Sequence, residues 1–338
     1  RALWLLCASV PLCLCVMLLP AAAQDDVLAR LTLEQRVGQL FFVNLYGSTL
    51  NAAGRDFLVQ YQPGGVVLMD GNAGEPADVT RLTNSYQQTI TDAGGLPLLI
   101  AVDQEGGPIA GLERSFTLFP TPALLAAAGD PALAARVGAA VAEELRAVGV
   151  NMNLAPVADL ENPDNTVLAR RTFGSDPAMI SPVIAGFIEG SQSAGVLATA
   201  KHFPGHGVTS GDSHTTLPIV PLSHEQLEAA DLVPFRAAVA ADVEAVMAAH
   251  IIYPAYDDTL PASLSPALLT GLLRDQLGFD GLILTDALDM DAIDTNFSYP
   301  EAAVLAIQAG ADMLLSAHIS PDNHAAAIQA VVEAVRAG

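Results

Sequence analysis

The sequence is short of lysine, cysteine and tryptophan. Lys201 is the single lysine among 338 residues, and the other thirteen basic residues are arginine. All three cysteines and the single tryptophan lie within the first fifteen residues. The rest of the chain therefore has no disulfide and no thiolate metal site, which for an exported protein suits a bacterial envelope better than a disulfide-built secreted module. Because lysine is so scarce, the position of Lys201 is informative.

Positive charge is scarce overall. The chain has 14 Lys and Arg against 37 Asp and Glu, for a formal net charge of −23. This charge argues against nucleic acid and against anionic membrane surfaces as partners, although it identifies no substrate. Apolar residues make up 51% of the chain, enough for the core of one large domain.

The N-terminal segment predicts export. Residues 1–23 have a basic first residue, a long apolar run and an A-x-A ending at Ala23, the pattern of a secretory signal peptide. The alternative is a retained membrane anchor, because the run approaches the ~20 residues that span a bilayer. Pro11 and Pro20 favour cleavage. We expect a bacterial protein, periplasmic or extracellular, whose mature residues 24–338 are not inserted in a membrane.

Eight short apolar runs recur along the mature chain. Continuous rather than alternating hydrophobicity is typical of parallel strands that are buried on both faces. The runs are VGQLFFVNL, GGVVLMD, LPLLIAVD, VNMNLAPVAD, VLATAKH, AVMAAH, GLILTD and ADMLLS. Ala-rich segments of helical spacing lie between most of them. This alternation predicts an α/β fold, a single (β/α)₈ TIM-type barrel. An open doubly wound sheet is the alternative, but no G-x-G-x-x-G joins a strand to a helix.

Several predicted helices begin with the same pattern of two residues. A residue with a side-chain oxygen that can cap the first N–H groups is followed by Pro at the first helical position. The capping residues are Asp130, Asp176, Ser265 and Ser320, and Ser223 to Gln226 have the pattern of a capping box.

Six of the eight runs end in an ionisable residue. The residues are Asp70, Asp103, Asp159, the pair Lys201–His202, His250 and Asp286. In a barrel of parallel strands these ends meet on one face, where catalytic groups lie. A polar residue at a strand end can simply mark the surface, but six together predict a common site.

The segment KHFPGHGVTSGDSH (201–214) carries further candidates. Pro204 and Gly205 end the strand, and a glycine-rich loop then presents Asp212 and His214. In D-x-H, the carboxylate can fix the tautomer of the ring two residues on, which suits His214 as a general acid/base.

The position of Asp286 in GLILTDALDM is compatible with several chemical roles. It could be a nucleophile, a metal ligand or a base, whereas Asp289 fits a charge near the N-terminus of the next helix. A metal site is a weaker hypothesis, because Pro204 prevents His202 and His206 from sharing a helical face and H-E-x-x-H is absent. We expect no metal and no cofactor.

The chain resembles the β-N-acetylglucosaminidase branch of glycoside hydrolase family 3. The resemblance extends over nearly the whole mature chain, in AVDQEGG, NLAPVADL, RTFGSDP, KHFPGHG with DSH, MAAHIIYP and LSPALLTGLLRDQLGFDGLILTDALDM. It implies that residues 24–338 are one catalytic barrel that hydrolyses a β-linked N-acetylglucosaminide with retention. The implied substrates are cell-wall (peptidoglycan) fragments or chitin-type oligosaccharides.

The resemblance also implies roles for individual residues. Asp286 would be the nucleophile, and Asp212 with His214 the acid/base pair. The sugar would be held by Asp103, Arg171, Lys201 and His202. This would explain the single lysine, since an ammonium group is a compact donor to sugar oxygens and the guanidinium fork is not.

The sequence departs from the family after DQEGG. Pro108 and Gly111 stand where arginines commonly grip the ligand, so Arg114 is a candidate substitute. Without tryptophan, stacking under a sugar would fall to Phe203 or Tyr253. A family 3 β-glucosidase, a glycoside phosphorylase and a catalytically inactive glycan-binding barrel remain as alternatives.

Overall fold

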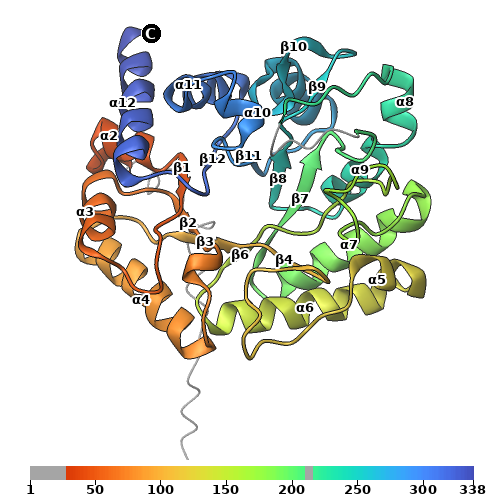
Figure 1. Ribbon diagram of the computed structural model, residues 1–338, viewed down its shortest axis with the longest axis horizontal. Helices are drawn as coiled ribbons and strands as arrows, with labels where there is room; N and C mark the ends of the chain where they lie inside the picture. The colour runs from red at the N-terminus through yellow and green to blue at the C-terminus, as the bar shows by residue number, and fades with distance from the viewer. Residues whose placement is uncertain (1–27, 210–215) are drawn as a thin grey trace, which may run out of the picture.

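The computed structural model describes residues 28–209 and 216–338. Eight parallel strands form a barrel with helices on its outside (Figure 1). Around the barrel they run β1 (Phe41–Val43), β2 (Gly65–Val67), β3 (Leu99–Val102), β6 (Met152–Asn153), β7 (Leu197–Phe203), β8 (Ala245–Ala248), β11 (Leu282–Thr285) and β12 (Leu314–Leu315). A parallel bridge between Leu284 and Met313 joins β11 to β12. The predicted barrel is confirmed, each apolar run supplies one strand, and the open doubly wound sheet is wrong.

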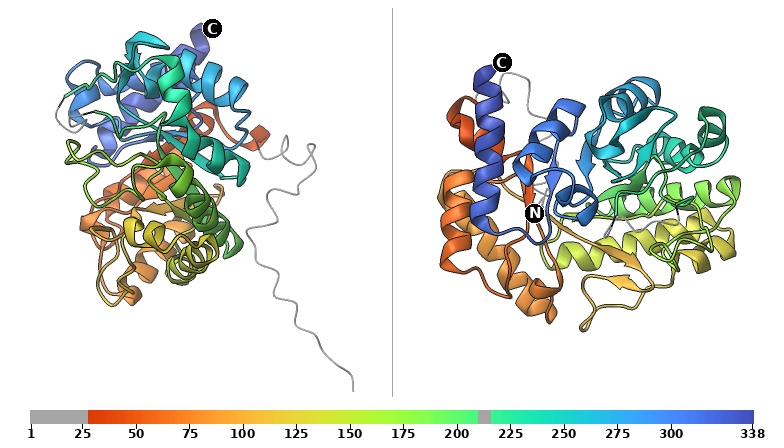
Figure 2. Two further views of the ribbon diagram at one scale, coloured as in Figure 1. Left: turned by 90° about the vertical axis from the view of Figure 1, so that its right-hand side faces the viewer. Right: turned by 45° about the horizontal axis from the view of Figure 1, so that its top comes forward.

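Helices surround the barrel, and most of them connect one strand to the next; α2 precedes the first strand and α12 follows the last. They are α2 (Leu33–Gly38), α3 (Ala52–Tyr61), α4 (Pro76–Asp92), α5 (Pro122–Ala128), α6 (Pro131–Ala147), α7 (Pro177–Ser193), α8 (His224–Ala229), α9 (Leu232–Ala240), the π-helical η4 (Ala267–Gln276), α10 (Asp291–Asp294), α11 (Tyr299–Ala309) and α12 (Pro321–Ala337). Figure 2 shows the same ring of helices from two other directions. Near the C-terminus, α12 packs against α2 and so covers the seam where the barrel closes.

Two small antiparallel sheets stand outside the barrel. One pairs β4 (Gln104–Gly106) with β5 (Ile109–Ala110), directly after β3. The other pairs β9 (Ile252–Tyr253) with β10 (Asp257–Pro261), after β8. Both follow the carboxyl ends of barrel strands, so they build up the rim on the face where the ionisable strand-end residues lie. Two 3₁₀ turns, η2 (Asp70–Asn72) and η3 (Ala262–Leu264), complete this rim.

The apolar core has two parts because each strand is buried on both faces. Phe42, Val67 and Leu284 belong to the cluster inside the barrel. Phe41 and Val43 belong to the larger cluster between strands and helices. Neighbouring residues of β1 therefore point to opposite sides, as the pleat of a strand requires, yet both sides are apolar. This is the physical reason for the continuous apolar runs in the sequence.

Most of the predicted helix starts are confirmed. Asp130, Asp176 and Ser320 accept hydrogen bonds from N–H groups of the first turns of α6, α7 and α12. The capping box at the start of α8 is present. The cap predicted at Ser265 is wrong: η4 has no side-chain cap, and the Ser265 hydroxyl donates to Asp257 Oδ2 at 2.7 Å.

The predicted signal peptide, residues 1–23, lies outside the described residues. Within the described part of the chain, none of the helices has the length and apolar character that crossing a bilayer requires.

Candidate active site

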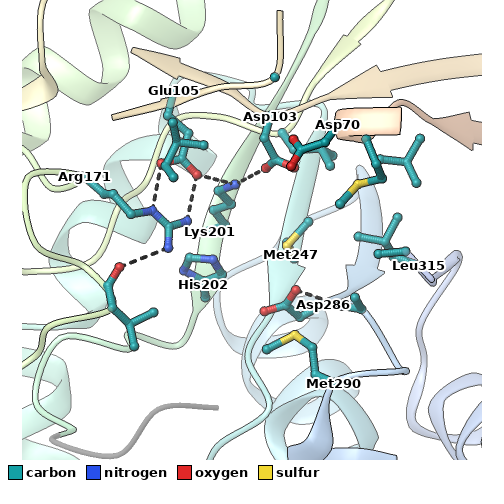
Figure 3. A pocket seen from close by; sticks show the side chains of 18 of the residues that line it. Asp70, Asp103, Glu105, Arg171, Lys201, His202, Met247, Asp286, Met290 and Leu315 are labelled. Carbon is teal, nitrogen blue, oxygen red and sulfur yellow. Dashed lines mark hydrogen bonds and ion pairs between the residues drawn. The ribbon is translucent and has the colours of Figure 1, made fainter. Parts of the chain in front are cut away.

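A cavity of about 610 Å³ opens at the carboxyl ends of the barrel strands (Figure 3). Five of the predicted strand-end residues line it: Asp70, Asp103, Lys201, His202 and Asp286. Lys201 and His202 lie in β7, Asp103 and Asp286 directly follow β3 and β11, and Asp70 begins the 3₁₀ turn η2 shortly after β2. The barrel therefore brings together side chains that are up to about 200 residues apart in the chain, as predicted for this face.

Lys201 is the centre of the charged wall of this cavity. Its side chain is only 3% exposed, and its Nζ lies 2.5 Å from Asp103 Oδ1 and 2.7 Å from Glu105 Oε1. Burial alone would lower the pKa of this ammonium group, but the two carboxylates raise it above its ordinary value. Lys201 is therefore held as a fixed cation.

Arg171 completes the charged wall. Its Nε and Nη2 donate to the two oxygens of Glu105 at 2.9 and 2.8 Å, which is the two-pronged geometry of a strong guanidinium–carboxylate pair. Burial would raise the pKa of Glu105, but Lys201 and Arg171 lower it to about 2. Figure 3 shows these groups converging on one side of the cavity. The structure thus places Asp103, Arg171, Lys201 and His202 together, as predicted.

Glu105 was missed in the sequence, although it holds both cations. The signal that could have found it is its spacing from Asp103, because residues i and i+2 of an extended segment point to the same side. Asp103 follows β3 and Glu105 lies in β4. The segment DQEGG therefore contributes a pair of carboxylates to the cavity, one partly exposed and one buried.

His202 is positioned by a buried carboxylate behind the cavity. Its Nδ1 lies 2.7 Å from Asp159 Oδ2, so the ring donates from Nδ1 and presents Nε2 to the cavity (Figure 3). Asp159 also accepts the backbone N–H of His206 at 2.7 Å. Burial would raise the pKa of Asp159, but His202 and His206 outweigh it and lower that pKa. Asp159 does not line the cavity, and it supports two residues that do.

Asp286 faces the charged wall from the other side of the cavity (Figure 3). Its Oδ1 accepts the N–H of Ala287 at 2.8 Å. Burial would raise the pKa of Asp286, but His202, His250, the Ala287 N–H and Lys201 together lower it to about 2. The group is therefore an anion across the neutral pH range, as a nucleophile or an electrostatic stabiliser must be.

His250 holds the loop that carries Asp286. It is fully buried and does not line the cavity. Its Nδ1 lies 2.7 Å from the Ser263 hydroxyl and its Nε2 lies 2.9 Å from the Ala287 carbonyl oxygen. Since a carbonyl only accepts, Nε2 carries the proton and Nδ1 accepts from Ser263. Burial lowers the pKa of His250, which favours this neutral form.

Several sequence predictions about individual residues are wrong. Phe203 and Tyr253 cannot stack under a sugar, because both are fully buried: Phe203 packs against another ring, and the Tyr253 hydroxyl donates to the Gly205 carbonyl. Arg114 is exposed and is not among the described residues that line the cavity. Asp289 does not serve the N-terminus of a helix. Its carboxylate accepts the N–H groups of residues 317 and 318 after β12.

Pro108 and Gly111, the two residues after DQEGG at which the sequence departs from the family, both line the cavity. A Cβ at Gly111 would lie 2.5 Å from Val102 Cγ2, so this backbone position has no room for a side chain. On the side of the cavity that carries Asp286, apolar side chains also line the wall, among them Met247, Met290 and Leu315 (Figure 3). The predicted acid/base residues Asp212 and His214 lie outside the described residues.

Comparison with protein families matches residues 32–338 to the Glycosyl hydrolase family 3 N terminal domain. The beta-hexosaminidase of Tolumonas auensis is 40% identical over 277 residues, which cover 81% of this chain and 81% of that protein. The beta-hexosaminidase of Methylococcus capsulatus is 37% identical over 291 residues, or 85% of each.

Solved structures agree with these relatives. A glycoside hydrolase family 3 beta-N-acetylglucosaminidase from Paenibacillus sp. is 42% identical, with a TM-score of 0.89 over 91% of this chain and 59% of that chain. NagZ from Neisseria gonorrhoeae, solved with N-trifluoroacetyl-D-glucosamine, is 29% identical, with a TM-score of 0.75 over 89% of this chain and 94% of that chain. This chain thus spans about three fifths of the Paenibacillus protein.

The buried cluster predicts a dependence of stability on acid. The folded-state pKa of Glu105 lies below its ordinary 4.5, so its contribution is present above that value and is lost as pH falls toward about 2. Glu105→Gln should lower the free energy of unfolding by about 3–5 kcal/mol at pH 7, because buried Arg171 loses its counter-charge and buried Lys201 loses one of its two. It should also flatten the fall in stability between about pH 5 and 2.

Urea unfolding at several pH values measures this effect. The control is Glu228→Gln, which removes the same charge from an exposed pair with Arg236 and should change stability by less than about 1 kcal/mol. Equal changes for the two variants would contradict the role assigned to Glu105.

Proposed function

We propose that this chain, which belongs to glycosyl hydrolase family 3 and is a glycoside hydrolase, removes terminal β-linked N-acetylglucosamine from oligosaccharides. The observation that carries the proposal is an ionised carboxylate, Asp286, facing a wall of fixed hydrogen-bond donors across one cavity. The beta-hexosaminidase names of relatives that match more than four fifths of the chain support the same activity.

The proposed reaction keeps the anomeric configuration and has two steps. In the first, an oxygen of Asp286 attacks the anomeric carbon while His214 gives its proton to the glycosidic oxygen, so the bond to the leaving sugar breaks. In the second, His214 takes a proton from water, and the hydroxide displaces Asp286. Asp212 would hold the ring of His214. A low pKa suits Asp286 to the role of nucleophile, because it must be ionised when the substrate arrives.

The charged wall would hold the sugar hydroxyls. Two of the three Nζ–H groups of Lys201 are directed to Asp103 and Glu105, which fixes the direction of the third. His202 presents Nε2, and Arg171 is fixed by its two bonds to Glu105. Donors that are already held by buried partners lose little freedom when the substrate binds, so they can orient the anomeric carbon toward Asp286.

Release of p-nitrophenol from the aryl β-N-acetylglucosaminide tests this proposal. The protein starting at Gln24 should be active, and Asp286→Ala and His214→Ala should each lose about 10³-fold or more in kcat/KM. Strong activity on the aryl glucoside instead would favour the β-glucosidase alternative, and phosphate-dependent release of sugar phosphate would favour the phosphorylase. Binding of N-acetylglucosamine without turnover would favour the glycan-binding barrel.

Residues 1–23 are proposed as a cleaved signal peptide, which places the enzyme in the periplasm or outside the cell. Expression of the full chain in a bacterial host tests this, by N-terminal sequencing of the protein recovered outside the inner membrane. The expected first residue is Gln24. Recovery of uncleaved chain in the membrane fraction would favour the retained anchor.

The charge at the mouth of the cavity favours chitin-type substrates over muramic-acid fragments. Asp70, Glu113 and Asp291 line the cavity and are exposed, and none forms an ion pair with another described residue. In a pocket that holds the terminal sugar inside, the leaving sugar lies at the mouth. Carboxylates there repel the carboxylate of a muramic acid unit and do not repel a neutral sugar.

Two disaccharides with the same terminal N-acetylglucosamine measure this preference. At low salt, kcat/KM should be about 3- to 10-fold higher for the disaccharide whose leaving sugar is N-acetylglucosamine than for the disaccharide whose leaving sugar is N-acetylmuramic acid. Added salt should reduce this difference in kcat/KM. The variant D70N/E113Q/D291N should narrow it as well.

The control for this preference carries the same change in charge on distant surfaces. Asp56, Glu143 and Asp275 are exposed and do not line the cavity. The variant D56N/E143Q/D275N should keep the wild-type ratio between the two disaccharides. A ratio that is insensitive to salt and to both variants would show that the mouth charges do not select the substrate.

A further inference from the structure

A second cavity, of about 390 Å³, lies beside the catalytic one. The loop after β1 and the loop between β12 and α12 line it, and His318 lines both cavities. The two spaces therefore meet at one residue, on the face of the barrel where substrate enters. Asp, Glu, Lys and Arg are absent from the described residues that line the second cavity. This distinguishes it from the charged site next to it.

Tyr46 is the exposed aromatic residue of the second cavity. It is 79% exposed, although the residues just before it, Asn44 and Leu45, are buried in the loop that follows directly on β1. Its ring lies on the backbone of Gly71: a Cβ at that glycine would come within 2.6 Å of Cε2 and 2.9 Å of Cδ2. A side chain at position 71 would displace the ring. One face of the otherwise exposed Tyr46 ring is thus supported by the backbone of Gly71.

The position of Gly71 connects this ring to the catalytic cavity. Its neighbour Asp70 lines the catalytic cavity (Figure 3), so the ring of Tyr46 rests on the 3₁₀ turn that forms part of the mouth. Phe, Tyr and Trp are absent from the described residues that line the catalytic cavity itself. The aromatic surface therefore lies next to the mouth, where the leaving part of an oligosaccharide would pass.

The other polar groups of the second cavity suit a neutral ligand. Thr49, Asn51 and Ser320 line it. The Asn51 side-chain oxygen caps α3 and the Ser320 hydroxyl oxygen caps α12, which fixes both side chains in place. Amide and hydroxyl groups beside an aromatic ring are the combination that binds a sugar, whose C–H face packs on the ring and whose hydroxyls take hydrogen bonds.

We propose that this second cavity, with Tyr46 as its platform, binds a further neutral sugar unit of the leaving part of the substrate. The inference rests on the proposed function and extends its chitin-type substrates to chains of three or more N-acetylated units. Binding energy gained at this subsite raises kcat/KM for the longer chains and is unavailable to an aryl glycoside.

The experiment compares kcat/KM for the p-nitrophenyl β-N-acetylglucosaminide with kcat/KM for chitobiose, chitotriose and chitotetraose. In the wild type, kcat/KM should rise from chitobiose to the longer chains. Tyr46→Ala should lower the values for the longer chains by about 3- to 10-fold, the usual effect of one aromatic contact, and leave the aryl glycoside unchanged. Tyr46→Trp should keep the preference, and Gly71→Ala, which displaces the ring, should lose it.

The control is Leu124→Ala on α5, which truncates a side chain that is 63% exposed and lines neither cavity. It should leave every substrate unchanged. Hydrolysis of the aryl glycoside with no gain from chain length, or an equal effect of Tyr46→Ala on all substrates, would overturn the subsite and leave the proposed function standing.

A wild type that is inactive on every glycoside would remove the proposed function itself. Calorimetric binding of chitotriose then decides the subsite separately. Weaker binding to Tyr46→Ala than to wild type supports the platform, and equal binding rejects it.

Discussion

The buried ion cluster around Lys201 is the interaction on which the site depends. An ammonium group with almost no exposure keeps its proton only if anions lie beside it, because burial without them favours the neutral amine. Glu105 supplies one anion to Lys201 and also fixes Arg171, so one buried carboxylate holds both cations of the cavity. Removing it leaves Arg171 without its carboxylate partner and Lys201 with Asp103 alone, and for that reason the stability and the architecture of the site are coupled.

Around this cluster the barrel separates three tasks. The β3–β7 side is rigid and carries fixed charges, and Asp159 behind it sets the ring of His202. Asp286, directly after β11, is an anion on the other side of the cavity, and His250 holds its loop through the Ala287 carbonyl. The mouth carries exposed carboxylates, and the ring of Tyr46 lies beside it. In the proposed function, chemistry and choice of substrate would therefore come from different strand ends, an arrangement that the (β/α)₈ fold allows.

Sequence reasoning predicted the fold and much of the site for identifiable reasons. Strands buried on both faces have continuous apolar runs, and parallel strands bring their ends to one face, so Asp103, Lys201 and Asp286 could be grouped before the structure was known. Sequence reasoning failed where the role of a residue depends on whether its side chain is buried. Phe203 and Tyr253 look like sugar-stacking rings in the sequence, yet both pack inside the protein. Tyr46 has no marker in the sequence, because its exposure depends on how its loop lies over Gly71.

The sequence by itself determined the barrel, the order of its strands and the identity of the ionisable residues at their ends. Those follow from local patterns of hydrophobicity and capping, which act over a few residues. The tertiary structure alone decided which of these residues share a cavity, that Glu105 joins Asp103 in neutralising Lys201, and that Asp159 and His250 stand behind the site and not in it. Distances between residues about 100 positions apart are set by the closure and twist of the whole barrel, and no local pattern records them.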